Sequence, residues 1–345
     1  MSSIKLNAID FFAGAGGITE GLKNAGFNVL LAVDIDPIFS TAHRKNHPDV
    51  PQLQMDMTKL DEKFLEAIVD GNHIHLVTGG PPCQGFSMAG ARRKDDPRNQ
   101  LFKHYVRVLN LIRPEFFFME NVKGMLSMKD NKGNKIIDNV YKEFKNLKGY
   151  KIKHFIINMA DYGVPQMRQR VLFIGNRLGI NPDECLPKKT HGPDTNKEYE
   201  IVWEHIGDLI TKTENDVPNH KKMNHSKEVE ERMAVIKEGC MIPKEFPKGK
   251  EYLKKNSYQT VYQRLHRNKP APTIVPGHMA FPIHPTENRS LTVREAARIQ
   301  TFPDSFEFVG PGISQGLQVG NAVPPLFAKK LSLHIKDLIL NKIKD

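Results

Sequence analysis

Positions 79–82 hold two glycines followed by two prolines, a combination that stops regular secondary structure. The apolar residues 74–77 before it are typical of a short buried strand. Each proline fixes its own φ and restricts the residue before it, so Cys83, which comes next, is presented in few conformations at a strand end. Its neighbours Gln84 and Ser87 are polar, and this setting favours a reactive thiol over a cysteine that only packs in a core.

A glycine-rich turn at residues 12–17 separates the apolar run 4–12 from a helical pattern that begins at Ile18. Strand, glycine turn and helix in this order form the first unit of a doubly wound sheet, whose ligands bind beyond the carboxyl ends of the strands. Thr19 stands where the dinucleotide fingerprint needs glycine, and the sequence contains no G-x-x-x-x-G-K-[ST] phosphate loop. The pattern therefore favours a nucleotide-like ligand without a pyrophosphate.

Acidic residues follow two further extended segments. Asp34 ends the apolar run 29–33, about twenty residues after the glycine turn, where a carboxylate can accept both hydroxyls of a ribose. Asp36 precedes a proline and is typical of a helix N-cap. Asp56 follows another short extended segment, and we interpret it as a candidate for an adenine amino group, with an exposed loop aspartate as the alternative.

Polar residues also end two later extended segments. Glu120 follows the aromatic run 115–119, at the sheet edge where Cys83 is expected, and a carboxyl group beside an apolar strand can have a raised pKa and donate a proton. A capping glutamate is the alternative. Arg168 and Arg170 alternate along the chain, so we expect both guanidiniums on one face, converging on one anion. Separate surface arginines are the alternative.

The composition bounds the class of protein. A chain of 345 residues is long enough for about two domains. Its 50 Lys and Arg against 39 Asp and Glu give a net charge of +11, which suits a polyanionic partner. Three cysteines without a C-x-x-C pair argue against a disulfide framework and structural zinc. No apolar run approaches the ~18 to 20 residues of a membrane span and residues 1–6 carry no secretory signal, so we expect a cytoplasmic protein.

Two segments are candidates for contact with that polyanion. The polar loop 89–100 follows the cysteine turn and carries Arg92 and Arg93, and such loops usually move or bind a ligand. Prolines interrupt residues 176–290, and within them 251–290 hold six Lys and Arg against two acids. A helix capped by Thr292, with Glu295 three residues on, is predicted after this region.

Together these motifs resemble those of the DNA cytosine-5 methyltransferases of bacterial restriction-modification systems. The resemblance rests on FAGAGG, GGPPCQGFS, the ENV triplet, the Q-x-R-x-R run, and the segments 289–302 and 318–325. It implies an α/β fold with a doubly wound, mostly parallel Rossmann-like sheet that binds S-adenosylmethionine, and a second, smaller target-recognition domain. The catalytic domain would cover 1–176, completed by 318–345, with target recognition at 177–317.

The resemblance also implies a reaction. Cys83 would add to ring carbon 6 of a cytosine flipped out of double-stranded DNA, and Glu120 would protonate ring nitrogen 3. Carbon 5 would then take the methyl group of S-adenosylmethionine, leaving S-adenosylhomocysteine, with no metal. Arg168 and Arg170 would orient the base or its backbone, and Asn121 would support the turn at Glu120.

Further residues are assigned by the same resemblance. The cofactor pocket would be lined by Phe12, Ala13, Gly14, Gly16, Gly17, Asp34, Ile35, Asp56, Met57, Gly80, Pro82, Leu101, Asn321, Ala322 and Val323. DNA would be contacted by Gln84, Ser87, Arg92, Arg93, Arg264 and Arg267, the last two within the basic stretch 263–270. The protein would be a nucleoid-associated monomer, and a cognate restriction endonuclease would act on the same site without a stable complex.

Three other functions stay open at this point. An RNA methyltransferase of the same family would use the same site, although the tRNA-directed branch usually carries a Cys-Phe-Thr tripeptide that is absent here. A nucleotide-dependent oxidoreductase would explain the glycine turn but neither Cys83 nor Glu120. A catalytically silent DNA-binding protein would be expected to lack one of these two residues.

Overall fold

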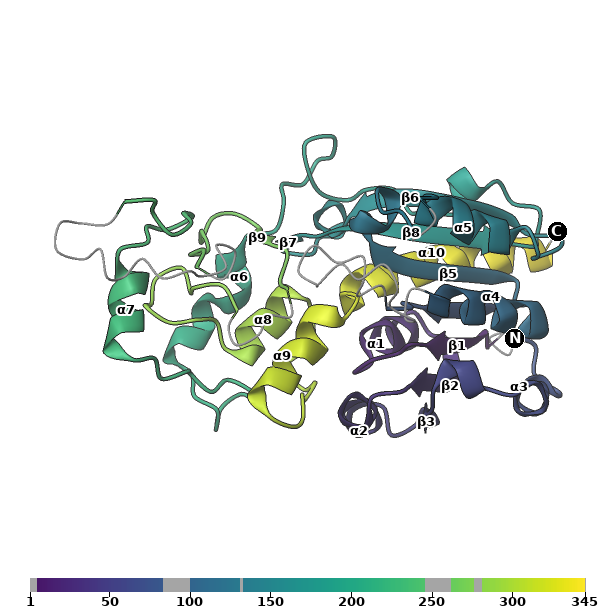
Figure 1. Ribbon diagram of the computed structural model, residues 1–345, viewed down its shortest axis with the longest axis horizontal. Helices are drawn as coiled ribbons and strands as arrows, with labels where there is room; N and C mark the ends of the chain where they lie inside the picture. Colours follow the sequence, from purple (N-terminus) through teal and green to yellow (C-terminus); the bar gives the residue numbers. More distant parts are fainter. Residues whose placement is uncertain (1–4, 83–99, 131–132, 246–261, 276–280, 345) are drawn as a thin grey trace. The chain divides into compact units, whose positions relative to one another are not determined.

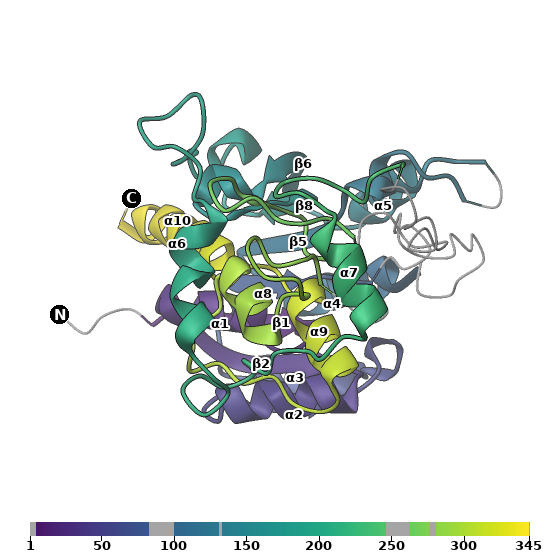
Figure 2. The same cartoon turned by 90° about the vertical axis from the view of Figure 1, so that its left-hand side faces the viewer.

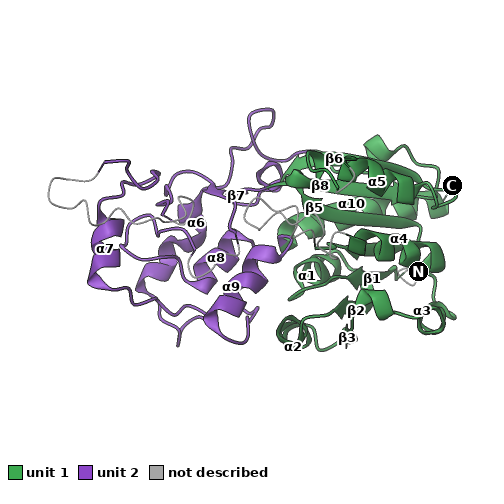
Figure 3. Ribbon diagram, in the orientation of Figure 1, with its two compact units in different colours: residues 1–158, 169–188, 325–345 green, residues 159–168, 189–324 purple. Residues whose placement is uncertain are grey.

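The computed structural model describes residues 5–82, 100–130, 133–245, 262–275 and 281–344. Its internal contacts divide the chain into two compact units, coloured separately in Figure 3. Unit 1 comprises residues 1–158, 169–188 and 325–345, and unit 2 comprises 159–168 and 189–324. Unit 1 is therefore discontinuous, with boundaries at 188 and 325, and residues 159–168 belong to unit 2. The division into a catalytic domain, 1–176 with 318–345, and a target-recognition domain, 177–317, stays a prediction.

Unit 1 is built on a seven-stranded sheet in the order β3-β2-β1-β4-β5-β8-β6. Neighbouring strands from β3 to β5 run parallel, whereas β8 runs antiparallel to both β5 and β6. This mostly parallel α/β sheet confirms the predicted fold class. The strands are β1 (Asn7–Phe11), β2 (Asn28–Asp34), β3 (Gln52–Gln54), β4 (Leu76–Gly79), β5 (Phe116–Val122), β6 (Lys151–Asn158) and β8 (Gln169–Asn176).

Helices cover both faces of this sheet (Figure 1). Apolar residues of α3 (Glu62–Val69), α4 (Leu101–Ile112) and α5 (Ile136–Phe144) share one core with Ile9 and Phe11 of β1. Successive strand residues point to opposite faces, so Asp10 points away from this core, where it bonds Thr19 of α1 (Gly17–Asn24). The sheet is therefore wound on both sides.

The last helix, α10 (Pro325–Lys344), returns the chain to unit 1 and packs beside α1. The two helices approach so closely that a Cβ added at Gly21 would lie 2.4 Å from the Cβ of Ala328. Glycine is therefore required where α1 meets α10. This contact places the final helix in the same compact unit as the sheet.

The described residues of unit 2 form little regular structure. Its helices are α6 (Val202–Ile206), α7 (Lys227–Ala234), α8 (Val293–Ile299) and α9 (Gly312–Asn321), and β7 (Gln166–Met167) pairs in parallel with β9 (Ala271–Pro272). Figure 2 turns α6, α8 and α9 toward the reader. Three phenylalanines, Phe302, Phe306 and Phe308, stack on one another in its core.

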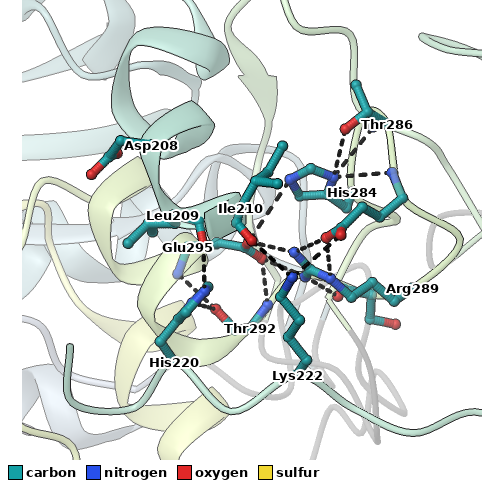
Figure 4. Close-up of polar contacts among 12 residues, drawn as sticks. Asp208, Leu209, Ile210, His220, Lys222, His284, Thr286, Arg289, Thr292 and Glu295 are labelled. Atoms are coloured by element: carbon teal, nitrogen blue, oxygen red, sulfur yellow. Dashed lines mark hydrogen bonds and ion pairs between the residues drawn. The ribbon is translucent and has the colours of Figure 1, made fainter. Parts of the chain in front are cut away.

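A buried polar network fixes the start of α8 in unit 2 (Figure 4). Glu295 is fully buried and accepts two hydrogen bonds from the guanidinium of Arg289, at 2.8 and 2.7 Å. Thr292 and Glu295 form the predicted capping box, which is confirmed. His220 bonds the Thr292 hydroxyl at 2.9 Å. The pairing matters because a buried carboxylate without partners would strongly destabilise the fold.

None of the helices that the structure describes is long and apolar enough to cross a membrane.

Candidate active site

The two turns singled out in the sequence lie at the point where the strand order of the sheet reverses. β1 and β4 are parallel neighbours, and their last residues, Phe11 and Gly79, are paired. Because β2 and β3 lie on one side and β5 on the other, this is the switch point at which doubly wound sheets bind ligands. The glycine turn follows β1, and the proline turn follows β4.

The proline turn is described as far as Pro82. The predicted nucleophile Cys83 and the predicted DNA contacts Gln84, Ser87, Arg92 and Arg93 lie outside the described residues. The geometry around the turn is therefore given by the side chains that reach it from neighbouring strands.

The glycine turn contains three residues in the left-handed region, Phe12 (φ 56°), Gly14 (φ 56°) and Gly16 (φ 109°). For Phe12 such a backbone is strained, so neighbouring contacts must hold it. Two of them come from β2, because Ala13 N donates to Val33 O at 3.0 Å and Gly14 N donates to an Asp34 carboxylate oxygen at 2.8 Å.

Asp34 is well placed to receive a polar ligand beside this turn. Its other carboxylate oxygen accepts from Asp36 N at 2.9 Å. Burial raises the pKa of Asp34, and hydrogen bonds from Asp36 N and Gly14 N oppose that rise. Ile35 follows with 63% of its surface exposed. Asp36 accepts from two backbone amides of α2 (Pro37–Asn46) and is the predicted N-cap.

The third predicted acidic residue, Asp56, caps a short 3-10 helix by accepting from Thr58 N at 2.9 Å. Met57 has its side chain in the core, and its carbonyl accepts from Arg107 at 3.1 Å. The predicted contact of Met57 with the cofactor stays a prediction. Leu101 begins α4 and is half-buried.

Glu120 lies beside the proline turn. A Cβ built on Gly80 would be 3.7 Å from Glu120 Oε2, so this carboxylate oxygen faces the turn backbone. The other oxygen, Oε1, pairs with Arg170 Nε at 2.9 Å, and both side chains are mostly buried. Burial lowers the pKa of Arg170, and the Glu120 charge opposes that effect. Arg170 therefore holds one oxygen of the carboxyl group, and the other oxygen faces the backbone of the turn.

Asn121 links the end of β5 to the same turn. Its side-chain amide donates to Pro81 O at 3.0 Å, and its carbonyl oxygen accepts from Val122 N at 2.8 Å. The residue after Glu120 thus fixes the backbone two residues before Cys83.

Arg168 has different partners from Arg170. It is 2% exposed and donates to Ile274 O at 3.3 Å and to Gly320 O and Ala322 O, both at 3.1 Å. The expected convergence of the two guanidiniums on one anion is therefore wrong. That expectation assumed one continuous strand. Arg168 instead falls between β7 and β8, and its guanidinium donates to backbone carbonyls of unit 2.

The predicted cofactor contacts near the C-terminus belong to unit 2. Asn321 is the exposed last residue of α9, Ala322 is half-buried, and Val323 is buried. Their place in a cofactor pocket remains a prediction.

The two arginines predicted to touch DNA also differ. Arg264 is 5% exposed and donates five hydrogen bonds of 2.7–2.9 Å, four of them to backbone carbonyls. Its donors are used inside unit 2, which contradicts a base contact by this residue. Arg267 is half-exposed; it pairs with both carboxylate oxygens of Glu238, and its guanidinium lies 5.6 Å from the Trp203 ring centroid.

Sequence reasoning missed a set of polar residues on β1, α1 and β4, the elements next to the two turns. Asp10, Thr19 and Thr78 are fully buried, and the hydroxyls of both threonines donate to the Asp10 carboxylate. The available signal was a carboxylate within the apolar run before the glycine turn, because a buried charge needs partners.

Comparison with known proteins identifies the family. The sequence pattern described as C-5 cytosine-specific DNA methylase matches residues 6–337. The chain is 40% identical to the type II methyltransferase M1.HphI of Haemophilus parahaemolyticus, over 95% of this chain and 86% of that relative. It is 36% identical to the type II methyltransferase M.DdeI of Desulfomicrobium norvegicum, over 96% of this chain and 88% of that relative.

Solved structures agree with these relatives. An E. coli protein described as a prophage-encoded DNA modification methyltransferase has a TM-score of 0.75 at 29% identity, covering 97% of this chain and 100% of that one. The S. pombe Dnmt2 methyltransferase has a TM-score of 0.68 at 18% identity, covering 99% and 100%, which shows a shared fold. The chain belongs to the C-5 cytosine-specific DNA methylases and is a DNA (cytosine-5-)-methyltransferase.

Proposed function

We propose that Cys83 is the nucleophile and Glu120 the proton donor of this methyltransferase, acting on a cytosine flipped out of a short, specific site in double-stranded DNA. The position of Glu120 carries the proposal. Its Oε2 faces the backbone of Gly80, three residues before Cys83, while Arg170 holds Oε1. The Glu120 carboxyl group therefore faces the turn after which Cys83 follows in the sequence, on the edge of the sheet where ligands bind.

The chemistry follows from these positions. Cytosine is not nucleophilic at ring carbon 5, so the Cys83 sulfur adds to carbon 6. Glu120 Oε2 delivers its proton to ring nitrogen 3, which turns the ring into an enamine. Carbon 5 then takes the methyl group and gives its own proton to a base from solvent. Elimination of the sulfur as a thiolate, with return of the nitrogen 3 proton to Glu120, restores the aromatic ring. Acid assistance of this kind contributes roughly 10² to 10⁴ in rate. Arg170 and Asn121 position the acid and the turn.

The family uses S-adenosylmethionine, which supplies an electrophilic methyl group when bound. The residues after β1 and β2 fit that molecule. Asp34 offers a half-buried carboxylate for the two ribose hydroxyls, and the exposed Ile35 side chain can lie against the adenine. Asp56 would accept from the adenine amino group. The backbone of the glycine turn would approach the methionine part, where a side chain at Gly14 would intrude.

We assign DNA contacts by charge and exposure. The chain carries a net charge of +11, and extrusion of the target base costs a few kcal/mol that contacts to the duplex must offset. Arg267 is the described arginine we assign to the DNA, and Arg92 and Arg93 are assigned to phosphates. Because its relatives are type II methyltransferases, we propose that the protein acts in the nucleoid as a monomer and protects host DNA. A cognate endonuclease would recognise the same site without forming a stable complex.

Transfer of labelled methyl groups from S-adenosylmethionine tests this proposal. Duplex DNA of mixed sequence should be labelled by the wild-type protein, with transfer RNA as the competing substrate. Cys83→Ala should lose transfer while its affinity for the cofactor stays within a fewfold. Turnover by Cys83→Ala at the wild-type rate would reject Cys83 as the nucleophile, and labelling of RNA alone would reject DNA as the substrate. Bisulfite sequencing of the labelled DNA then identifies the methylated cytosine.

A further inference from the structure

The buried carboxylate of Asp10 forms hydrogen bonds to the elements that adjoin the two turns of the active site. Asp10 of β1 and Thr78 of β4 are paired residues of neighbouring parallel strands, and both are fully buried. Asp10 Oδ1 accepts from the Thr78 hydroxyl at 2.7 Å, and Oδ2 accepts from the Thr19 hydroxyl at 2.8 Å. Each carboxylate oxygen thus binds a different element, α1 after the glycine turn and β4 before the proline turn.

The same chain of hydrogen bonds extends to the helix that follows Asp34. His43 of α2 is fully buried, and its Nε2 lies 3.1 Å from the Thr19 hydroxyl. Because that hydroxyl donates to Asp10, it accepts from His43, which fixes the Nε2 proton. His47, one turn later, places Nε2 3.3 Å from Gly16 O, and a Cβ at Gly16 would come within 2.7 Å of it. α2 and the residue that follows it therefore contact both the first turn of α1 and the glycine turn.

We propose that Asp10 is a positioning residue for methyl transfer: through Thr19 and Thr78 it holds the cofactor turn and the nucleophile turn at one fixed spacing. This inference rests on the roles proposed above for those turns. It follows from geometry, because one carboxylate provides the shared acceptor for hydroxyls on both sides of the switch point. Transfer between two bound groups requires such fixed placement, since a 1 Å error can cost about a hundredfold in rate.

A purely structural role would not need this arrangement. A buried charge is costly, and apolar residues of similar volume at these three positions would often pack at no greater cost. The backbone strain at Phe12, two residues after Asp10, persists only where the surroundings hold it. The carboxylate of Asp10 restrains β1 next to this turn with directional, charge-assisted bonds, in addition to the bonds that Ala13 N and Gly14 N donate to β2.

Asp10 carries a negative charge near pH 7, whereas the histidines and the tyrosine around it are neutral. Burial raises the pKa of Asp10 to about 6, and the hydroxyls of Thr78 and Thr19 oppose that rise. Burial lowers the pKa of His43 to about 3 and that of His47 to about 4, so both are neutral near pH 7. The negative charge of Asp34 on β2 repels that of Asp10 and so also raises the pKa of Asp10. Burial and the Asp10 charge raise the pKa of Tyr105 on α4, which stays neutral.

Cross-effects between the two turns test the inference. Thr19→Val lies on the cofactor side, and it should slow methyl transfer at saturating S-adenosylmethionine by about tenfold. Thr78→Val lies on the nucleophile side, and it should weaken binding of S-adenosylhomocysteine on the order of threefold to tenfold, measured by calorimetry. Thr78→Ser keeps the hydroxyl and should restore wild-type values. Thr41→Val, an exposed threonine of α2, is the control for loss of a hydroxyl in the same unit.

The outcomes distinguish a positioning role of Asp10 from a purely structural one. If either valine variant lowers the melting temperature but leaves both transfer and affinity per folded molecule at wild-type values, the role is only structural and the inference fails. It also fails if each variant affects its own side alone. In an Asp10→Asn background the Thr19→Val and Thr78→Val effects should largely disappear; full persistence there would overturn the role of Asp10. Failure of the wild-type protein to bind the cofactor product would instead contradict the proposed function, and this inference with it.

Discussion

Arg264 and Arg267 lie three residues apart and offer a matched pair of substitutions. Arg264→Gln removes a guanidinium that donates to the carbonyls of Met233, Ile236, His284 and Glu287. A buried acceptor that loses its donor costs about 1 to 3 kcal/mol, and relaxation makes the losses less than additive. We therefore expect the free energy of unfolding to fall by about 3 to 5 kcal/mol, most of it from unit 2.

Arg267→Gln should behave in the opposite way. Its partner Glu238 and its own side chain are partly exposed to solvent, so loss of the ion pair should change stability little. If Arg267 reads a guanine edge, affinity for the cognate duplex should fall about ten- to hundredfold, and affinity for a scrambled duplex much less.

Urea unfolding and duplex binding at two salt concentrations measure both effects, after the methylated site has been mapped. For Arg264→Gln, affinity per folded molecule should change equally on cognate and scrambled duplexes. The reasoning is refuted if Arg264→Gln leaves stability unchanged while it lowers cognate affinity selectively. Equal losses on both duplexes for Arg267→Gln would place base readout elsewhere in unit 2.

Four further outcomes are expected. Asp34→Ala should raise the Kd of S-adenosylmethionine about ten- to hundredfold in calorimetry, because charged hydrogen bonds to the ribose are lost; a Kd within twofold of wild type would contradict the ribose contact. Glu120→Gln should lower single-turnover transfer by roughly 10² to 10⁴ but DNA affinity only a fewfold; equal losses would argue against an acid. Neutralising Arg92 and Arg93 should reduce the slope of log affinity against log salt by about 0.9 per phosphate contact on any duplex; an unchanged slope would exclude both contacts. Asp10 binds its proton more tightly in the folded state, with a pKa of about 6 against 3.8. Its contribution to the free energy of unfolding is therefore full below about pH 4 and is lost as the pH rises through about 6. Urea unfolding of Asp10→Asn should lack this decrease of stability with pH.

Local patterns were sufficient for much of the fold. The N-cap at Asp36 and the capping box of Thr292 and Glu295 depend on residues a few positions apart, and both were predicted. The apolar run before Glu120 likewise predicted a buried strand with a carboxyl group at its end. Such features depend on hydrogen bonds between residues close in the chain, so a short stretch of sequence is enough to predict them.

Long-range partners could not be predicted in the same way. Arg264 and Arg267 belong to one basic stretch, yet carbonyl groups from two distant segments bury the first and leave the second half-exposed. Arg168 alternates with Arg170, but a break between two strands sends it to other partners. The bond between Asp10 and Thr78 joins residues 68 positions apart, and only strand order brings them together.

The most direct test of the account is a covalent trap. A duplex of random sequence in which 5-fluorocytosine replaces cytosine blocks release, because fluorine at carbon 5 cannot leave as a proton does. With S-adenosylmethionine, the wild-type protein should form an adduct that survives denaturation, and mass spectrometry of its peptides should place the DNA on Cys83. Cys83→Ala should form none. An adduct on another residue, or an equal yield from Cys83→Ala, would contradict the central claim that this sulfur attacks the base.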